Sequence, residues 1–200
     1  MAENLDFQND LLRSLPLIAG AIFAATAHML ALAFRSVLVP LKAVLLNMLS
    51  VSAAFGLMVL VFQQGVGGRL FGLAGPTSAV FVAVPVLVFA VVFGLSMDYE
   101  VFLLSRIKEA FDRTNDNAAA TIAGLSATAS VITSAAVIMI VVFGAFAFAR
   151  MLVIQVLGFG LAVAVLLDAT IVRLVMVPAL MHLAGRWNWW PGVPIGARRE

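Results

Sequence analysis

Long apolar runs constrain this chain more than any other feature of its sequence. A bilayer core about 30 Å thick is crossed by about 20 apolar residues of helix. The sequence contains five such runs: Leu15–Phe34, Ala43–Phe62, Val80–Leu104, Leu125–Ala149 and Met151 to about Leu174. Sixty-four per cent of its residues are apolar and 11% are charged, whereas a soluble domain averages about 45–50% apolar and about 25% charged residues. The sequence therefore predicts an all-α membrane protein, a bundle of five transmembrane helices.

The basic residues predict how this bundle lies in the membrane. Positively charged loops stay on the cytoplasmic side. Eight basic residues fall on one side of the predicted bundle, namely Arg35, Lys42, Arg106, Lys108, Arg113, Arg186, Arg198 and Arg199, and three on the other, namely Arg13, Arg69 and Arg150. We therefore expect an extracytoplasmic segment over residues 1–14, a membrane domain over 15–185 and a cytoplasmic tail over 186–200. Trp187, Trp189 and Trp190 are expected to anchor that tail at the membrane interface.

Two of the segments between the apolar runs have compositions that predict local structure. The external stretch Gln63–Ser78 is rich in glycine and contains Pro76, a composition typical of turns. The cytoplasmic stretch Ser105–Gly124 alternates positive and negative charges and is expected to form a short interfacial helix.

Several classes of function are excluded or disfavoured by the composition. The chain has no cysteine, which excludes zinc bound by cysteine, iron–sulfur centres and thiol catalysis. It has no basic cluster among aromatic residues, which disfavours nucleic-acid binding. No His, Asp and Glu residues stand at metal-ligand spacing, and no phosphate-binding loop or nucleophile elbow is present. We therefore expect that the chain is not an enzyme and that it has no catalytic residues, no cofactor and no metal site.

Ionisable residues inside the apolar runs are the candidate functional residues. Each costs at least about 2.5–3.5 kcal/mol at the bilayer centre, so such groups face protein or water and mark ion pathways. Asp98 precedes Tyr99 about two turns inside the predicted cytoplasmic boundary. A buried carboxyl group beside a phenol that can donate or accept a hydrogen bond has the chemistry of a proton relay. The alternative is a structural bond between Asp98 and a neighbouring helix.

Three further charged residues in the apolar runs give weaker evidence of a function. Glu100 lies nearer the interface and is expected to extend toward it or to pair with Lys108 or Arg106. Asp168 and Arg173 lie five residues apart in the last run, which is an awkward separation for a direct pair within one α-helix. Asp168 lies deeper and is expected to face the bundle interior, whereas Arg173 is expected to reach the cytoplasmic interface or to neutralise a carboxylate on another span. A structural charge pair is the favoured role of both residues, and support for the relay is the alternative.

Hydroxyl groups form a stripe on the fourth predicted span. Its members recur at spacings of three and four residues among alanines: Ser126, Ser130, Thr133 and Ser134. Such small hydroxylated residues let helices pack closely and satisfy polar groups on neighbouring helices. We expect this stripe to face Asp98, either as simple close packing or as support for proton transfer.

Three sequence blocks resemble one family of transporters. They are Phe34-Arg-Ser-Val-Leu-Val-Pro-Leu-Lys42, the block Phe93-Gly-Leu-Ser-Met-Asp-Tyr-Glu100 with its continuation to Glu109, and Gly158 to Met181 followed by Gly185-Arg-Trp-Asn-Trp-Trp-Pro191. They resemble the MMPL (mycobacterial membrane protein large) family of the resistance–nodulation–division (RND) superfamily. The resemblance extends from about Leu5 to Pro191.

The resemblance implies a proton-driven exporter of lipids or hydrophobic compounds in the bacterial plasma membrane. Family members have twelve spans in two related halves, and this chain resembles spans eight to twelve. Asp98 and Tyr99 match the Asp-Tyr pair of the tenth span, which helps to carry protons. The first half, the seventh span and both porter domains have no counterpart in this sequence. We therefore expect the chain to act with protons, lipid and a second polypeptide that supplies the missing half, or as a homo-oligomer. The alternative is a structural remnant that does not transport.

Overall fold

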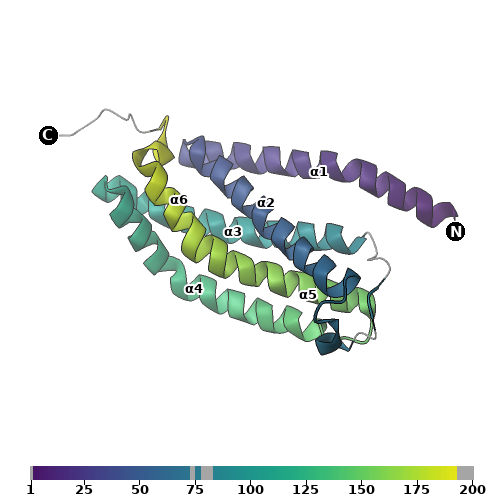
Figure 1. Cartoon of the computed structure of the whole chain (residues 1–200). Coiled ribbons are helices and arrows are strands. Elements are labelled where there is room, and N and C mark those ends of the chain that lie inside the picture. Colours follow the sequence, from purple (N-terminus) through teal and green to yellow (C-terminus); the bar gives the residue numbers. More distant parts are fainter. Residues whose placement is uncertain (1, 73–74, 78–82, 193–200) are drawn as a thin grey trace.

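Five long helices form the molecule, as the apolar runs predict. The computed structural model of the chain describes residues 2–72, 75–77 and 83–192, and for residues 2–13 and 15 it describes the backbone alone. Within these residues five helices are long and apolar enough to cross a membrane. They lie side by side and alternate in direction, with α1 along one edge (Figure 1). The all-α membrane fold is thus confirmed.

The helices are longer than the apolar runs. The first three membrane helices are α1 (Ala2–Phe34), α2 (Leu38–Met58), extended by the short π-helical segment η1 (Val59–Gln63), and α3 (Ala83–Thr114). The fourth is α4 (Asn117–Phe146). The fifth runs through α5 (Leu152–Leu167), the π-helical segment η3 (Asp168–Met176) and α6 (Val177–Ala184), and ends in the 3₁₀ turn η4 (Gly185–Trp189). A further 3₁₀ turn, η2 (Gly68–Phe71), lies in the glycine-rich loop. Residues 80–82 of the third predicted span lie outside the described residues.

The charged stretch Ser105–Gly124 does not form a separate interfacial helix, and that expectation is wrong. Instead α3 continues to Thr114 and α4 begins at Asn117. Asn115 adopts a positive φ of 52°, and the Asp116 carboxylate accepts hydrogen bonds from the backbone N–H groups of Ala118 and Ala119. An N-cap of this kind fixes the start of a helix, so two residues are enough to reverse the chain.

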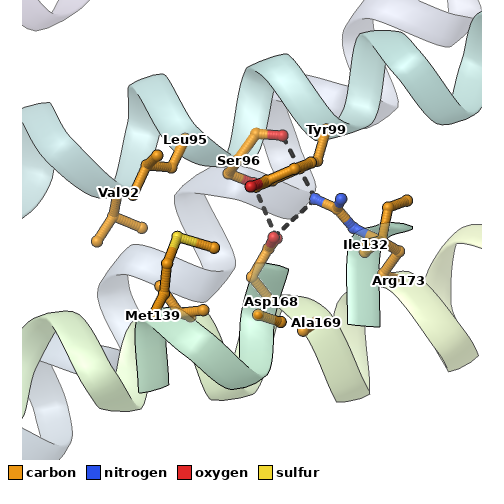
Figure 2. A pocket seen from close by; sticks show the side chains of 11 residues that line it. Val92, Leu95, Ser96, Tyr99, Ile132, Met139, Asp168, Ala169 and Arg173 are labelled. Carbon is orange, nitrogen blue, oxygen red and sulfur yellow. Dashed lines mark hydrogen bonds and ion pairs between the residues drawn. The ribbon is translucent and has the colours of Figure 1, made fainter. Parts of the chain in front are cut away.

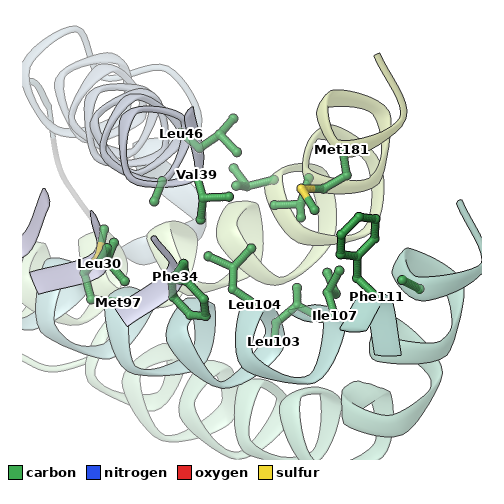
Figure 3. Packing of buried hydrophobic residues seen from close by; sticks show 14 of the residues in the cluster. Leu30, Phe34, Val39, Leu46, Met97, Leu103, Leu104, Ile107, Phe111 and Met181 are labelled. Atoms are coloured by element: carbon green, nitrogen blue, oxygen red, sulfur yellow. The ribbon is translucent and has the colours of Figure 1, made fainter. Parts of the chain in front are cut away.

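The core lies where α1, α2, α3 and α6 meet. Figure 3 shows Leu30, Phe34, Val39, Leu104 and Met181 converging on one buried cluster. A second cluster, around Phe62, Val88 and Val156, fills the opposite half of the bundle. Many other large apolar side chains point outward, Leu17 and Leu183 among them, as expected where lipid is the solvent.

The chain returns to the bundle after α6 and closes one end of it. Asn188 and Trp189 are fully buried. The Asn188 side-chain amide donates to Asn117 and to the Met181 carbonyl, while its own carbonyl oxygen accepts from Lys42 Nζ. The Asn188 backbone carbonyl accepts from the Ser36 hydroxyl. We call this group, Ser36, Asn117, Asn188 and Trp189, the clasp, and the end of the bundle where it lies the clasp end.

Trp189 therefore does not anchor the chain at an interface, and this expectation is wrong for that residue. Its ring stacks on Phe111 at 5.0 Å between centroids, and its Nε1 donates to Asn117 Oδ1 at 3.2 Å. Trp187 and Trp190 are exposed, as an interfacial role requires. Residues 193–200 of the expected tail lie outside the described residues.

Close helix contacts depend on glycine at two positions of the bundle. A Cβ at Gly124 of α4 would lie 2.4 Å from Ile107 Cγ1 and 2.9 Å from the Ile107 backbone N of α3. A Cβ at Gly158 would lie 2.5 Å from Phe146 Cβ, where α5 meets α4. Small residues let helix backbones approach in this way inside a membrane.

We predict that Gly124→Ala destabilises the bundle. The added methyl group forces α3 and α4 apart, and overpacking of this kind costs about 1–3 kcal/mol. Gly144→Ala is the matched control in the same helix, because nothing lies within 4 Å of a Cβ there. Unfolding of both variants in mixed micelles checks the expectation, which equal stability of the two variants would refute.

Candidate functional site

A buried ion pair lies inside the last membrane helix. Arg173 Nη2 stands 2.7 Å from Asp168 Oδ2, and the two side chains are only 4% and 11% exposed. Charges at this depth need a partner because the bilayer core offers no water to solvate them. The two charges therefore stabilise each other in a place where neither could remain alone.

The π-helical segment explains how residues five apart can pair. Asp168 begins η3 and Arg173 lies inside it. A π-helix forms i→i+5 hydrogen bonds, so its turn is wider than that of an α-helix and side chains five residues apart come to lie about one turn apart. The spacing is awkward for a direct pair only in an α-helix, and the π-helical geometry of this segment allows the pair to form.

Ser96 and Tyr99 of α3 complete the cluster. The Ser96 hydroxyl donates to Asp168 Oδ1 at 2.8 Å, and its backbone carbonyl lies 3.4 Å from Arg173 Nη2. The Arg173 guanidinium carbon stands 5.4 Å from the centre of the Tyr99 ring, a cation–π distance. Figure 2 shows these four side chains pointing toward one another from the two helices.

Sequence reasoning missed Ser96, although a signal was present. Ser96 and Tyr99 are three residues apart and therefore share one helix face. Asp98 belongs to another face. The spacing therefore predicts that Ser96 lies on the same face of α3 as the Tyr99 phenol.

A small cavity adjoins the four polar side chains. Its volume is about 10 Å³, and Ser96, Tyr99, Asp168 and Arg173 contribute to its wall together with apolar residues such as Met139. This is about the least volume that holds one water molecule. The site can thus accommodate a water molecule beside the carboxylate.

Asp98 points away from this cluster. It is exposed, and Gly94, one turn before it on α3, is exposed as well. Leu87 and Val91 continue the same outward face. The expectation that the five helices bury Asp98 is therefore wrong. Tyr99, partly buried, is the only member of the predicted pair that touches the ion pair among the described residues.

The hydroxyl stripe of α4 does not face Asp98 either. Its four members are all exposed: Ser126, Ser130, Thr133 and Ser134. The buried face of α4 instead carries Gly124 and Thr128, because the glycine contact with α3 fixes the rotation of the helix. Ser126 and Thr133 line an open groove of about 380 Å³ between α4 and the last helix, and Arg173 forms part of its wall.

Glu100 also differs from its expectation. Its side chain is buried and 7% exposed, and it does not reach the interface. Arg106 pairs with Glu109, and Lys108 pairs with Asp112. These i,i+3 and i,i+4 partners on the same helix are nearer to the two bases than a residue on the inner face of α3.

The polar groups of the cluster around Asp168 and Arg173 include a carboxylate, a phenol and a hydroxyl group. No group of three or more His, Asp or Glu side chains that could hold a metal ion occurs within residues 2–72, 75–77 and 83–192. Carboxylate, phenol and hydroxyl groups lie together instead, and each of them can exchange a proton with water.

Five apolar helices around a buried ion pair define a multi-pass α-helical membrane protein. The chain belongs to the MMPL family, whose family model matches residues 2–199.

Curated relatives agree with this assignment. The chain is 47% identical over 186 residues to the mycolic acid-containing lipids exporter MmpL11 of Mycolicibacterium smegmatis. The aligned region covers 92% of this chain and 19% of that protein. It is 46% identical over 186 residues to the heme uptake protein MmpL11 of Mycobacterium tuberculosis H37Rv, again 92% of this chain and 19% of the relative. It is 40% identical over 199 residues to the trehalose monomycolate exporter MmpL3 of Mycobacterium tuberculosis CDC 1551, 99% of this chain and 21% of the relative. The chain thus spans about a fifth of the length of these relatives.

We predict that Asp168 and Arg173 are strongly coupled in stability. Asp168→Asn or Arg173→Met alone leaves one charge buried without its partner, which costs about 3–5 kcal/mol. The double variant should lose much less than the sum of the two single losses. Unfolding of the four proteins in mixed micelles measures this coupling.

Asp112→Asn serves as the control for this cycle. Its carboxylate lies on the exposed part of α3 beside Lys108, so its loss should change stability little. Additive effects of Asp168→Asn and Arg173→Met would contradict the coupling.

Proposed function

We propose that the chain is the C-terminal membrane part of a proton-driven exporter of lipids or hydrophobic compounds. One observation carries the proposal. Asp98 stands on the outer face of the five-helix bundle, and its neighbour Tyr99 touches a buried ion pair. A carboxyl group in this position joins the inside of the bundle to whatever covers its surface.

Lipid cannot be that cover. A charged Asp at the bilayer centre costs at least about 2.5–3.5 kcal/mol, so such a residue faces protein or water. Gly94 on the same face lets another helix approach closely. We infer that a second polypeptide carrying the other half of the transporter packs against this face of α3. A homo-oligomer is the alternative cover.

The proposed proton coupling uses Asp98 and its neighbour Tyr99, which contacts the buried cluster. Asp98 binds a proton from the external side and releases it toward the cytoplasm. Tyr99 donates or accepts a hydrogen bond as the charge on Asp98 changes. Asp168, Arg173 and Ser96 support the phenol from inside the bundle.

The nature of the substrate comes from the relatives alone. Two of those reported above are named exporters of lipids, and one is named a heme uptake protein. All these cargoes are large and hydrophobic, which agrees with export or uptake at a membrane. The substrate of this chain is therefore proposed as a lipid or another hydrophobic compound.

The charges also support an orientation. Six basic residues lie at or near the clasp end: Arg35, Lys42, Arg106, Lys108, Arg113 and Arg186. By the positive-inside rule this end faces the cytoplasm, and the N-terminal end of α1 lies outside.

We predict that Asp98→Asn abolishes proton-dependent transport by the assembled exporter, reducing it at least about tenfold. The amide keeps the size of the carboxyl group and loses the exchangeable proton. Lipid flux in proteoliposomes with an imposed pH gradient is the measurement. Asp112→Asn, on the same helix and exposed, should transport normally. Unchanged flux in Asp98→Asn would show that this residue carries no protons.

The mass of the native complex tests the proposed partner. The chain, tagged at its C-terminus, is extracted from native membranes in mild detergent. A co-purifying polypeptide with further membrane spans supports a divided exporter, and a homo-oligomer supports cover by a second copy. A lone chain of 21.2 kDa would favour the non-transporting remnant.

A further inference from the structure

Three polar groups, two on α2 and one in the ion pair, are buried without hydrogen-bond partners among the described residues. They are the Asn47 side-chain amide, the Ser50 hydroxyl and Arg173 Nη1. Asn47 and Ser50 are 1% and 2% exposed. An unsatisfied buried polar group costs about 1–3 kcal/mol, and water at such sites normally makes the missing bonds. Polar residues that only hold helices together would be bonded across the interface, but these are not.

Glu100 is a buried carboxyl group that the site described above does not use. Its buried carboxyl group lines a second cavity of about 10 Å³, together with Lys42, Leu46 and Val177. No hydrogen bond or ion pair of Glu100 occurs among the residues that the structure describes. This cavity, like the one beside Asp168, has about the volume of one water molecule.

The helix geometry places the unpartnered groups between the two cavities. α2 and α3 run in opposite directions (Figure 1). Leu46 and Glu100 both line the second cavity. Ser50 lies four residues beyond Leu46 in α2, and Ser96 lies four residues before Glu100 in α3. Each of these steps is about one α-helical turn, or about 6 Å, away from the clasp end. Asn47 and Ser50, three residues apart, share one face of α2.

Charged side chains lie at both ends of the polar region formed by Ser50, Asn47 and Glu100. Asp168 and Arg173 line the first cavity, and Lys42 of α2 lines the second cavity together with Glu100. α6 contributes only apolar side chains there, namely Val177, Leu180 and Met181. Lys42 also reaches the clasp, because its Nζ donates to the Leu180 carbonyl at 2.8 Å and to Asn188.

We propose that Ser50, Asn47 and Glu100 line a hydrated track that carries protons between the Asp168–Arg173 site and Lys42 at the clasp end. The Glu100 carboxylic acid gives its proton to a water molecule on the side of Lys42, which becomes a hydronium ion. The Glu100 carboxylate then takes a proton from a hydronium ion on the side of Asp168, which becomes water, so the group returns to its first state. The hydration of the track stands on the geometry alone, whereas its use in transport rests on the proposed function.

Hydration is tested with single cysteines, because the native chain has none. Asn47→Cys and Ser50→Cys are produced in native membranes and treated with 2-aminoethyl methanethiosulfonate, a small reagent that attacks thiolates in water. Unreacted thiols are then counted with a fluorescent maleimide after denaturation. Ala54→Cys is the matched control, since Ala54 is fully buried one turn beyond Ser50 in an apolar cluster.

We expect positions 47 and 50 to react at least about tenfold faster than position 54. Equal, slow reaction at all three positions would overturn the hydrated track. A cysteine at position 50 differs from serine by one atom, so this variant should fold even if the one at position 47 does not.

The role of Glu100 is tested by infrared spectroscopy of the purified chain. The carboxyl band lost in Glu100→Gln identifies this group, and its shift in heavy water gives the rate at which water reaches it. Ser50→Val, which replaces the hydroxyl with a methyl group, should slow this exchange at least about tenfold. Thr133→Val on the exposed face of α4 is the control and should not. A band with the same exchange rate in both variants would overturn the track.

The outcomes separate this inference from the proposed function. If Asp98→Asn transports normally while positions 47 and 50 react rapidly, the proposed transport mechanism fails and the hydrated track stands. If Asp98→Asn is inactive while positions 47 and 50 react as slowly as position 54, the hydrated track fails and the proposed transport mechanism stands. Where both tests succeed, Glu100→Gln should reduce proton-driven flux at least about tenfold.

Discussion

The buried pair of Asp168 and Arg173 is the interaction on which the rest of this structure depends. Neither charge is tolerable alone in a bilayer, and a direct pair at this spacing requires the wide turn of a π-helix. That turn also determines where Ser96 and Tyr99 of α3 can meet the last helix. An unusual stretch of backbone, a buried ion pair and a polar contact between two helices thus have one cause. Irregular helices of this kind are frequent at functional sites.

The inner faces of the helices are packed against one another, whereas the outer face of α3 carries an exposed charged residue, Asp98. These inner faces meet in two apolar clusters and are closed at one end by the clasp. The outer face of α3 carries Asp98, which lipid cannot solvate. The inward ion pair has both of its charges within this chain, whereas the outward carboxyl group of Asp98 requires protein or water beside it.

Hydropathy predicted the number of membrane helices because the thickness of the bilayer imposes a minimum length on each apolar run. It could not predict which face of each helix turns inward. In water, polar residues mark the outside of a helix, but in lipid both faces are apolar and this signal weakens. The outward stripe of Ser126 and Thr133 was assigned inward for that reason, and so was Asp98. The Asn188 and Trp189 contacts were missed because they join segments far apart in the sequence, and the pairing of Asp168 with Arg173 depends on a backbone geometry that spacing alone does not reveal.

Tyr99 is the residue that joins the open outer side to the closed interior. It follows Asp98 in sequence, and its ring lies 5.4 Å from the Arg173 guanidinium carbon. The face of an aromatic ring attracts a cation, so movement of the phenol changes how firmly Arg173 is held. If Asp98 carries protons as we propose, Tyr99 is the side chain through which a change of its charge would reach the ion pair. The same guanidinium has a nitrogen without a partner among the described residues and is held to Asp168 through its other terminal nitrogen. The proposed coupling would then act through Tyr99 on Arg173, without movement of a whole helix.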